Sequence, residues 1–163
     1  MTSLIIRALV SGTIAAATTT IAATLAGRRI AGSYTAPINA TSHILWGEAA
    51  NHENTPSFKY TGAGFLLNQG ASVFWAVFYE LLAGSMRLSR GRALVSGALV
   101  SAAAYVVDYH VVPKRLTPGF EQRLPEKALA LIYVALAAGL CIRDLVLPPS
   151  KTKVLAKEKR ILH

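Results

Sequence analysis

Four long apolar stretches alternate with shorter basic segments along this chain, and they predict four membrane-spanning helices. The first stretch is uncharged from Ala8 to Ala26 and the second from Tyr60 to Tyr79. At about 1.5 Å of rise per residue, each can cross a hydrocarbon core about 30 Å thick. The third runs from Ala93 to about Val112 and the fourth from Ala128 to about Leu147. Charged residues occur in these two only near one end, so we place those charges at or just inside a membrane interface.

The longest connection, residues 27–59, contains a second and shorter helical pattern. Thr35 is a candidate N-cap, Pro37 suits the first helical turn, and apolar residues follow as far as Trp46. Tryptophan is favoured at membrane interfaces, so we expect a short interfacial helix anchored by Trp46. The predicted fold class is therefore all-α: a polytopic membrane protein with a four-transmembrane-helix bundle and a short interfacial helix in the first loop.

The composition agrees with one membrane domain. The chain has 163 residues, of which 53% are hydrophobic and 15% charged, against roughly 25% charged in soluble domains. Its mean hydropathy is +0.41. We expect the four-helix domain to occupy residues 1–150 and a basic cytoplasmic tail to occupy residues 151–163. The net charge of +9 does not indicate nucleic acid binding, because the Lys and Arg residues fall between the apolar stretches or in the tail.

The distribution of basic residues predicts an orientation. Four crossings put ten Lys and Arg residues on the side of the termini and seven on the other side. The positive-inside rule then places both termini in the cytoplasm. The lipid bilayer is the expected partner, together with a second copy of the chain or another membrane protein.

Small and weakly polar residues recur at helical spacing within the apolar stretches, so they should face the interior of the bundle. They are Gly64, Asn68, Ser72, Trp75 and Tyr79 in the second stretch, Gly97, Ser101, Tyr105 and Asp108 in the third, and Ala8, Gly12 and Ala16 in the first. Two interpretations fit. These faces either pack helices together through close contacts and hydrogen bonds, or they line a polar path or a small ligand cleft.

Asp108 is the most informative single residue, because a carboxylate inside a membrane segment needs a partner or water. It either pairs with Lys114, Arg115 or Arg123, or accepts hydrogen bonds from Tyr or Asn side chains. At the other end of the second stretch, Glu80 should reach the cytoplasmic interface and pair with Arg87 or Arg90, which follow in the next loop.

A metal site is a further hypothesis for the face that carries Asp108. His43 and His110 map to the same membrane face as Asp108, and imidazole and carboxylate groups bind divalent transition metals. A metal-bound water could then be activated for hydrolysis. The spacings match no HExxH-type motif, so no cofactor is predicted from them.

Three segments carry a family resemblance: APINATSHILWG (36–47), SVFWAVFYE (72–80) and DYHVVPKRLTPGFEQRL (108–124). There the chain resembles a group of small, uncharacterised bacterial membrane proteins with about four helices, some labelled "sodium:proline symporter". The resemblance implies a location in the bacterial inner membrane and brings no established activity. Sodium-coupled symporters are built from inverted repeats of roughly ten or more helices, which do not fit in 163 residues.

Three functions follow from these patterns. The first is a non-enzymatic accessory or structural membrane component, self-associating through the face of Ala8, Gly12 and Ala16. The second is a small oligomeric transporter or channel with a polar intramembrane face, and the third a membrane-embedded metal-dependent enzyme using His43, His110 and Asp108. The candidate polar site comprises Asp108, His110, His43, Asn68, Tyr105 and Trp46.

Overall fold

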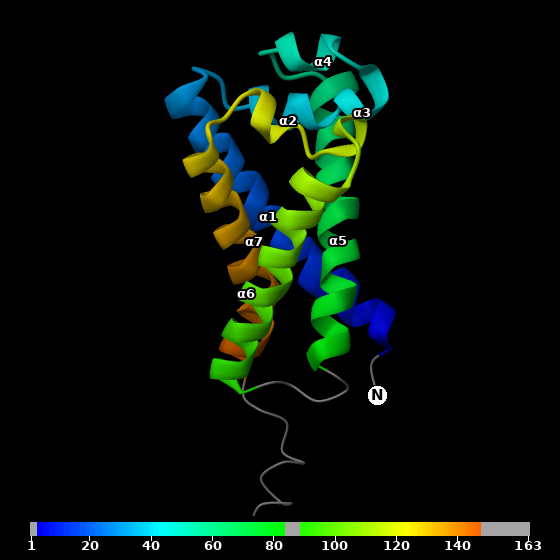
Figure 1. The fold of residues 1–163 in the computed structure, drawn as a ribbon, viewed down its shortest axis with the longest axis vertical. Coiled ribbons are helices and arrows are strands. Elements are labelled where there is room, and N and C mark those ends of the chain that lie inside the picture. The colour runs from blue at the N-terminus through cyan, green and yellow to red at the C-terminus, as the bar shows by residue number, and fades with distance from the viewer. Residues whose placement is uncertain (1–2, 84–88, 148–163) are drawn as a thin grey trace, which may run out of the picture.

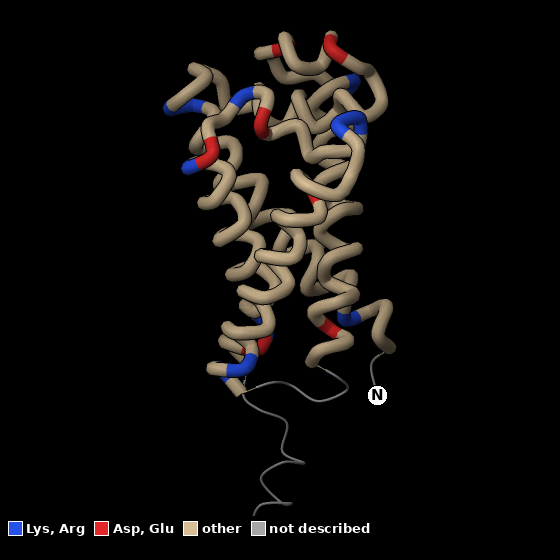
Figure 2. The backbone as a smooth tube through the Cα atoms, viewed as in Figure 1, with Lys and Arg blue, Asp and Glu red and all other residues tan. Residues whose placement is uncertain are grey.

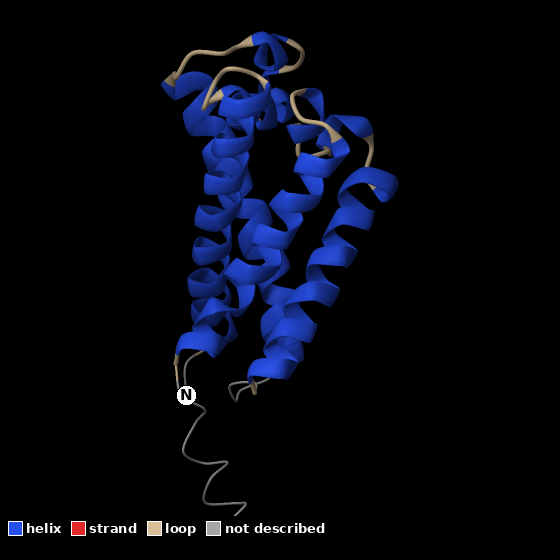
Figure 3. Cartoon of the chain, turned by 90° about the vertical axis from the view of Figure 1, so that its left-hand side faces the viewer, coloured by secondary structure: helices blue, strands red, loops and turns tan. Residues whose placement is uncertain are grey.

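The computed structural model describes residues 3–83 and 89–147, and all regular secondary structure in these two ranges is helical. Four long helices form the bundle. They run side by side in Figures 1 and 3. They are α1 (Leu4–Ile30), α5 (Ala63–Ala83) preceded by the π-helical turn η1 (Phe58–Gly62), α6 (Arg90–Val106) continued by the π-helical turn η2 (Val107–Val111), and α7 (Glu126–Val146). All four are long and apolar enough to cross a membrane. The predicted all-α four-helix bundle is confirmed, and it supports a multi-pass membrane protein.

Helix α1 packs along both α5 and α7, and α6 packs mainly on α7. Small residues allow these close approaches, because a side chain at their positions would meet the neighbouring backbone. A Cβ atom added at Gly12 would lie 2.5 Å from the Cα atom of Val73 on α5, and one at Gly97 would lie 2.8 Å from the carbonyl oxygen of Ala137 on α7. Close packing of backbones through small residues is typical of membrane bundles.

The face of Ala8, Gly12 and Ala16 on α1 is therefore used inside the chain. All three residues are buried, with Ala8 1% and Ala16 0% exposed. This corrects the expectation that the face is free for self-association. Helix α5 already covers this face. Its small residues allow close packing between two helices of one chain, not between two copies of the chain.

The start of α1 and the end of α7 lie at the same end of the bundle, at the bottom of Figure 1. The connections between α1 and α5 and between α6 and α7 lie at the opposite end, which we call the cap (residues 31–57 and 112–125). In Figure 2 most of the charged residues lie towards these two ends. The predicted basic tail, residues 151–163, lies outside the described residues.

The first part of the cap differs from the prediction of one interfacial helix. It forms three short helices, α2 (Ala36–Thr41), α3 (His43–Trp46) and α4 (Ala49–His52). Every residue of α2 is buried, and α2 packs on α1 and α5 rather than at the periphery. Gly27 and Gly64 make room for it, because a Cβ at either position would clash with Pro37 or with the carbonyl oxygen of Ile38.

Trp46 lies at the end of α3, where Gly47, with φ of +66°, stops the helical run. Its side chain is 45% exposed and its indole donates a hydrogen bond to the carbonyl oxygen of Lys59 at 3.0 Å. On the exposed rim nearby, the hydroxyl and backbone amide of Thr55 donate to the Glu53 carboxylate and hold its pKa below the usual value. Trp46 is thus a surface residue of the cap, fixed to the start of the second span.

The two parts of the cap are tied together across the mouth of the bundle. Gly119 adopts a left-handed conformation with φ of +85°, which brings its Cα atom so close to Ala40 that any side chain would clash. Arg123 donates to the carbonyl oxygen of Asn51 at 2.5 Å and to the side-chain oxygen of Asn54. The first loop is therefore folded back over the bundle mouth.

Candidate functional site

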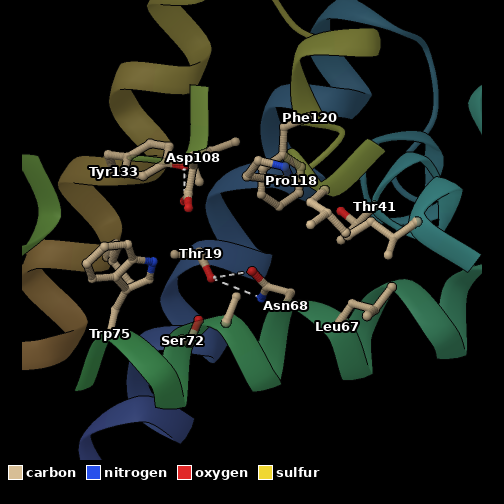
Figure 4. Close-up of a pocket in the computed structure, with 15 residues that line it drawn as sticks. Thr19, Thr41, Leu67, Asn68, Ser72, Trp75, Asp108, Pro118, Phe120 and Tyr133 are labelled. Atoms are coloured by element: carbon tan, nitrogen blue, oxygen red, sulfur yellow. Dashed lines mark hydrogen bonds between the residues drawn. The ribbon is translucent and has the colours of Figure 1, made fainter. Parts of the chain in front are cut away.

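A cavity of about 230 Å³ lies beneath the cap, between α1, α5, α7 and the turn η2. Figure 4 shows its lining. Its apolar side chains come from helices and cap together, and include Ile44, Leu67, Leu116, Phe120, Ile132 and Leu136. Its polar side chains are Thr19, Thr41, Asn68, Ser72, Asp108 and Tyr133, with the indole of Trp75. We call this space the Asp108 cavity.

Asp108 is held at the edge of the cavity by the π-helical turn η2. The hydroxyl of Tyr133 on α7 donates a hydrogen bond to Oδ2 of Asp108 at 2.7 Å. The indole nitrogen of Trp75 on α5 faces the same carboxylate across the cavity (Figure 4). Two kinds of partner were predicted for Asp108, a basic side chain or a Tyr or Asn donor, and the tyrosine donor is confirmed. In the described part of the chain no Lys, Arg or His side chain forms an ion pair with it.

Asn68 lines the same cavity, but its amide is committed to α1. Its Nδ2 lies 3.1 Å from the hydroxyl oxygens of Thr19 and Thr20 and 3.3 Å from the carbonyl oxygen of Ala16. Figure 4 shows the pair of contacts with Thr19. Asn68 therefore joins α5 to α1, which is the first of the two interpretations given for its stripe, and it also lines the cavity. Ser72, one turn further along, directs its hydroxyl towards the cavity (Figure 4).

Tyr105 does not line the cavity with Asp108. Its ring packs against Tyr109 and Tyr133, with centroid separations of 5.2 Å in both cases. It borders instead an apolar groove between α6 and α7 that also contains Ser101 and Cys141. The predicted polar face of Asn68, Ser72, Tyr105 and Asp108 is therefore divided: three of its members meet at the cavity, and Tyr105 lies behind Tyr133.

The histidines of the candidate site lie apart from the cavity. His43 is 5% exposed, and its two ring nitrogens lie 2.9 Å from the carbonyl oxygen of Ala40 and 3.3 Å from that of Lys114. His110 is exposed, with its ring 5.9 Å from that of Tyr105. Within residues 3–83 and 89–147, no three His, Cys, Asp or Glu side chains come close enough to hold a metal ion. The structure thus does not bring His43, His110 and Asp108 together as a ligand set.

A second polar cluster lies at the end of the bundle opposite the cap. Glu80 on α5 is 0% exposed, and Arg143 on α7 contacts both of its carboxylate oxygens, at 2.9 and 3.0 Å. Arg7 on α1 lies 3.1 Å from Oε2, and the hydroxyl of Ser11 donates to Oε1 at 2.5 Å. These four residues form the Glu80 cluster. Its arginines come from the first and last helices and not from Arg90, which corrects that part of the expected pairing. Arg87, the other expected partner, lies outside the described residues.

Tyr79 and Asp144 extend this cluster. The hydroxyl of Tyr79, which is fully buried, donates to Oδ2 of Asp144 at 2.7 Å. Asp144 Oδ1 lies 3.6 Å from Nη2 of Arg143. Two carboxylates thus offset two guanidinium groups, so the buried charges balance within the cluster.

Sequence reasoning identified Asp108 and Asn68 but did not single out Tyr133, which holds the Asp108 carboxylate. The available signal was that Tyr133 interrupts an otherwise apolar run in α7 with a hydroxyl that needs a partner when buried. The Glu80 cluster had a similar signal. Arg7, Glu80 and Arg143 each lie where an apolar stretch meets the same side of the membrane, so opposite charges on separate helices share one level.

Of the two polar clusters, the Asp108 cavity has space for a ligand, whereas the Glu80 cluster is filled by its own side chains. Comparison with known proteins adds no relative from which an activity could be transferred: no family model, no curated protein and no solved structure matches this chain.

Proposed function

We propose that this protein is a small multi-pass membrane protein that binds a small, mostly apolar ligand in the Asp108 cavity. One observation carries the proposal: a space of about 230 Å³ beneath the cap, lined by apolar side chains and a few polar groups. Ligand sites in proteins commonly combine apolar walls with a few fixed polar groups. Even an apolar cavity of about 150 Å³ takes up benzene, so this one has room for one ring with a short substituent.

Binding is better supported than the other functions that the sequence suggests. The accessory function drew its support from the small-residue face of α1, which α5 covers. A continuous transport path would have to pass the Glu80 cluster, whose side chains fill the far end of the bundle. A metal-dependent enzyme would need ligands at the cavity, and neither His43 nor His110 lines it.

The proposal includes a location and an orientation. We place the protein in a bacterial inner membrane with both termini in the cytoplasm. Two observations support this: the resemblance noted above, and the ten basic residues that the sequence assigns to the side of the termini. The cap then faces the opposite side, and a ligand would reach the cavity from the cap or from the outer half of the bilayer.

Fluorescence of Trp75 tests the proposal directly, because the chain has two tryptophans and only Trp75 lines the cavity. A Trp46→Phe variant leaves Trp75 as the single reporter. Benzyl alcohol, a ring with one short polar substituent, serves as the probe. Titrated into detergent-solubilised protein, it should change the Trp75 emission along a saturating curve.

The matched control is a Trp75→Phe variant, in which Trp46 on the exposed cap is the single reporter. Benzyl alcohol that only dissolves in the detergent would change both emissions linearly. A linear response of Trp75 that parallels the response of Trp46 would therefore refute the proposed function.

A further inference from the structure

We infer that the Asp108 cavity selects a small organic cation: a protonated amine carried on an aromatic or short aliphatic body. This inference rests on the proposed function and specifies the chemical class of the ligand. It depends on the charge, the ring systems and the size of the cavity.

The charge of the lining is one-sided. Asp108 is its one carboxylate, and among the described residues that border the cavity there is no Lys, Arg or His. The groups that hold Asp108, the Tyr133 hydroxyl and the Trp75 indole, are neutral donors. A carboxylate within a membrane segment is stabilised by a positive partner, and nothing in the described lining supplies one.

Cationic side chains near Asp108 in the sequence are held elsewhere. Arg123 donates to the backbone of Asn51 and to the side chain of Asn54, both in the first part of the cap. Lys114 and Arg115 are exposed on the cap surface. The carboxylate thus meets the cavity without a counter-ion from residues 3–83 or 89–147, and a ligand that enters can supply the positive charge.

The ring systems around Asp108 favour a cation for a second reason. Trp75, Phe120 and Tyr133 all line the cavity, and the faces of aromatic rings attract ammonium groups. The attraction is stronger in an apolar setting, and leucines and isoleucines make up much of the rest of the lining. An ammonium group beside Asp108 would therefore gain from the carboxylate and from the rings together.

Volume limits the rest of the ligand. A space of about 230 Å³ admits one ring or a short chain beside the ammonium group, but not a large amphiphile. The apolar walls favour a body without further polar groups, because any such group would lose its hydrogen bonds to water on entry.

The experiment compares three probes of nearly equal shape in the Trp46→Phe protein: benzylamine, benzyl alcohol and benzoate. At pH 7 the amine is protonated, as lysine is, the alcohol is neutral and the acid is negative. We expect benzylamine to bind roughly ten-fold or more tightly than benzyl alcohol, which corresponds to about 1.4 kcal/mol, and benzoate to bind more weakly than both. All three probes are compared in a protein that keeps Asp108, so the result does not depend on whether a variant of the cavity folds.

An Asp108→Asn variant then assigns the preference to the carboxylate. Asparagine has the same shape and still accepts the Tyr133 hydrogen bond, so benzyl alcohol should bind as before while benzylamine falls to the affinity of the alcohol. If the protein that keeps Asp108 binds benzylamine and benzyl alcohol equally well, the inference is overturned and the proposed function stands. An amine preference that survives Asp108→Asn would also overturn it. If benzyl alcohol does not give a saturating curve, the proposed function itself fails.

Discussion

Replacing Glu80 with Gln should destabilise the bundle more than any other single charge-neutralising change in its described part. Glu80 is 0% exposed, and its carboxylate accepts from two arginines and a serine on two other helices. Gln keeps the shape but removes the negative charge and turns an NH₂ group towards guanidinium donors. The arginines are then left without the charge that offsets theirs.

The expected size of the effect follows from the exposure of the two arginines. Removing one partner of a buried ion pair costs about 3–5 kcal/mol. The side chains of Arg7 and Arg143 keep 17% and 14% exposure, so both retain some access to water and to lipid headgroups. We therefore expect a loss near the lower limit, about 3 kcal/mol. An exposed ion pair would contribute about 1 kcal/mol or less.

Unfolding by increasing SDS in mixed micelles, followed by circular dichroism, measures this loss. Glu126→Gln is the matched control, because Glu126 is exposed at the start of α7 and should change stability by less than about 1 kcal/mol. Arg143→Gln should approach the cost of Glu80→Gln, and the double variant should cost less than the sum, because the two side chains share one bidentate contact. A Glu80→Gln protein as stable as the Glu126→Gln control would refute the reasoning.

Two further predictions use the same unfolding assay. Gly64→Ala should lower stability by about 1–3 kcal/mol, because its new methyl group would clash with the carbonyl oxygen of Ile38, whereas Gly70→Ala on the same helix faces open space and should be neutral or slightly stabilising. Equal stability of these two variants would contradict the close contact of α2 with α5. Tyr79→Phe should cost about 1–3 kcal/mol, because Asp144 loses its 2.7 Å hydrogen bond in a buried setting; an unchanged SDS midpoint would show that Asp144 does not depend on that donor.

The spanning helices were predictable because their signal is local. Long uncharged runs need no tertiary information: α1 contains the first predicted uncharged stretch completely, and η1 together with α5 contains the second. The ends were less predictable. Helix α1 runs from Leu4 to Ile30 and includes Arg7, Arg28 and Arg29, because a helix continues beyond the hydrocarbon core while its charged side chains reach the interface.

The cap was less predictable because its structure depends on distant residues. Burial of α2 depends on Gly27 and Gly64, which lie on two different spanning helices, and a helical pattern in the loop contains no trace of that contact. The division of the polar face has a backbone cause. Tyr105 and Asp108 would share one face of a regular α-helix, but the π-helical turn that contains Asp108 changes the angular spacing, so the two side chains separate. Whether a helix contains such a turn is decided by packing, not by local sequence.

The Glu80 cluster also has a consequence for the order in which the protein is assembled. Glu80 lies on the second spanning segment, whereas Arg7 belongs to the first and Arg143 to the last. A chain that enters the bilayer from its N-terminus brings Glu80 together with Arg7 first. The bidentate partner arrives only when α7 has been inserted. A chain that stopped before α7 would pair Glu80 with Arg7 alone, and its carboxylate would lack the two contacts that Arg143 makes. The final helix therefore supplies the bidentate partner of Glu80 as well as a packing surface.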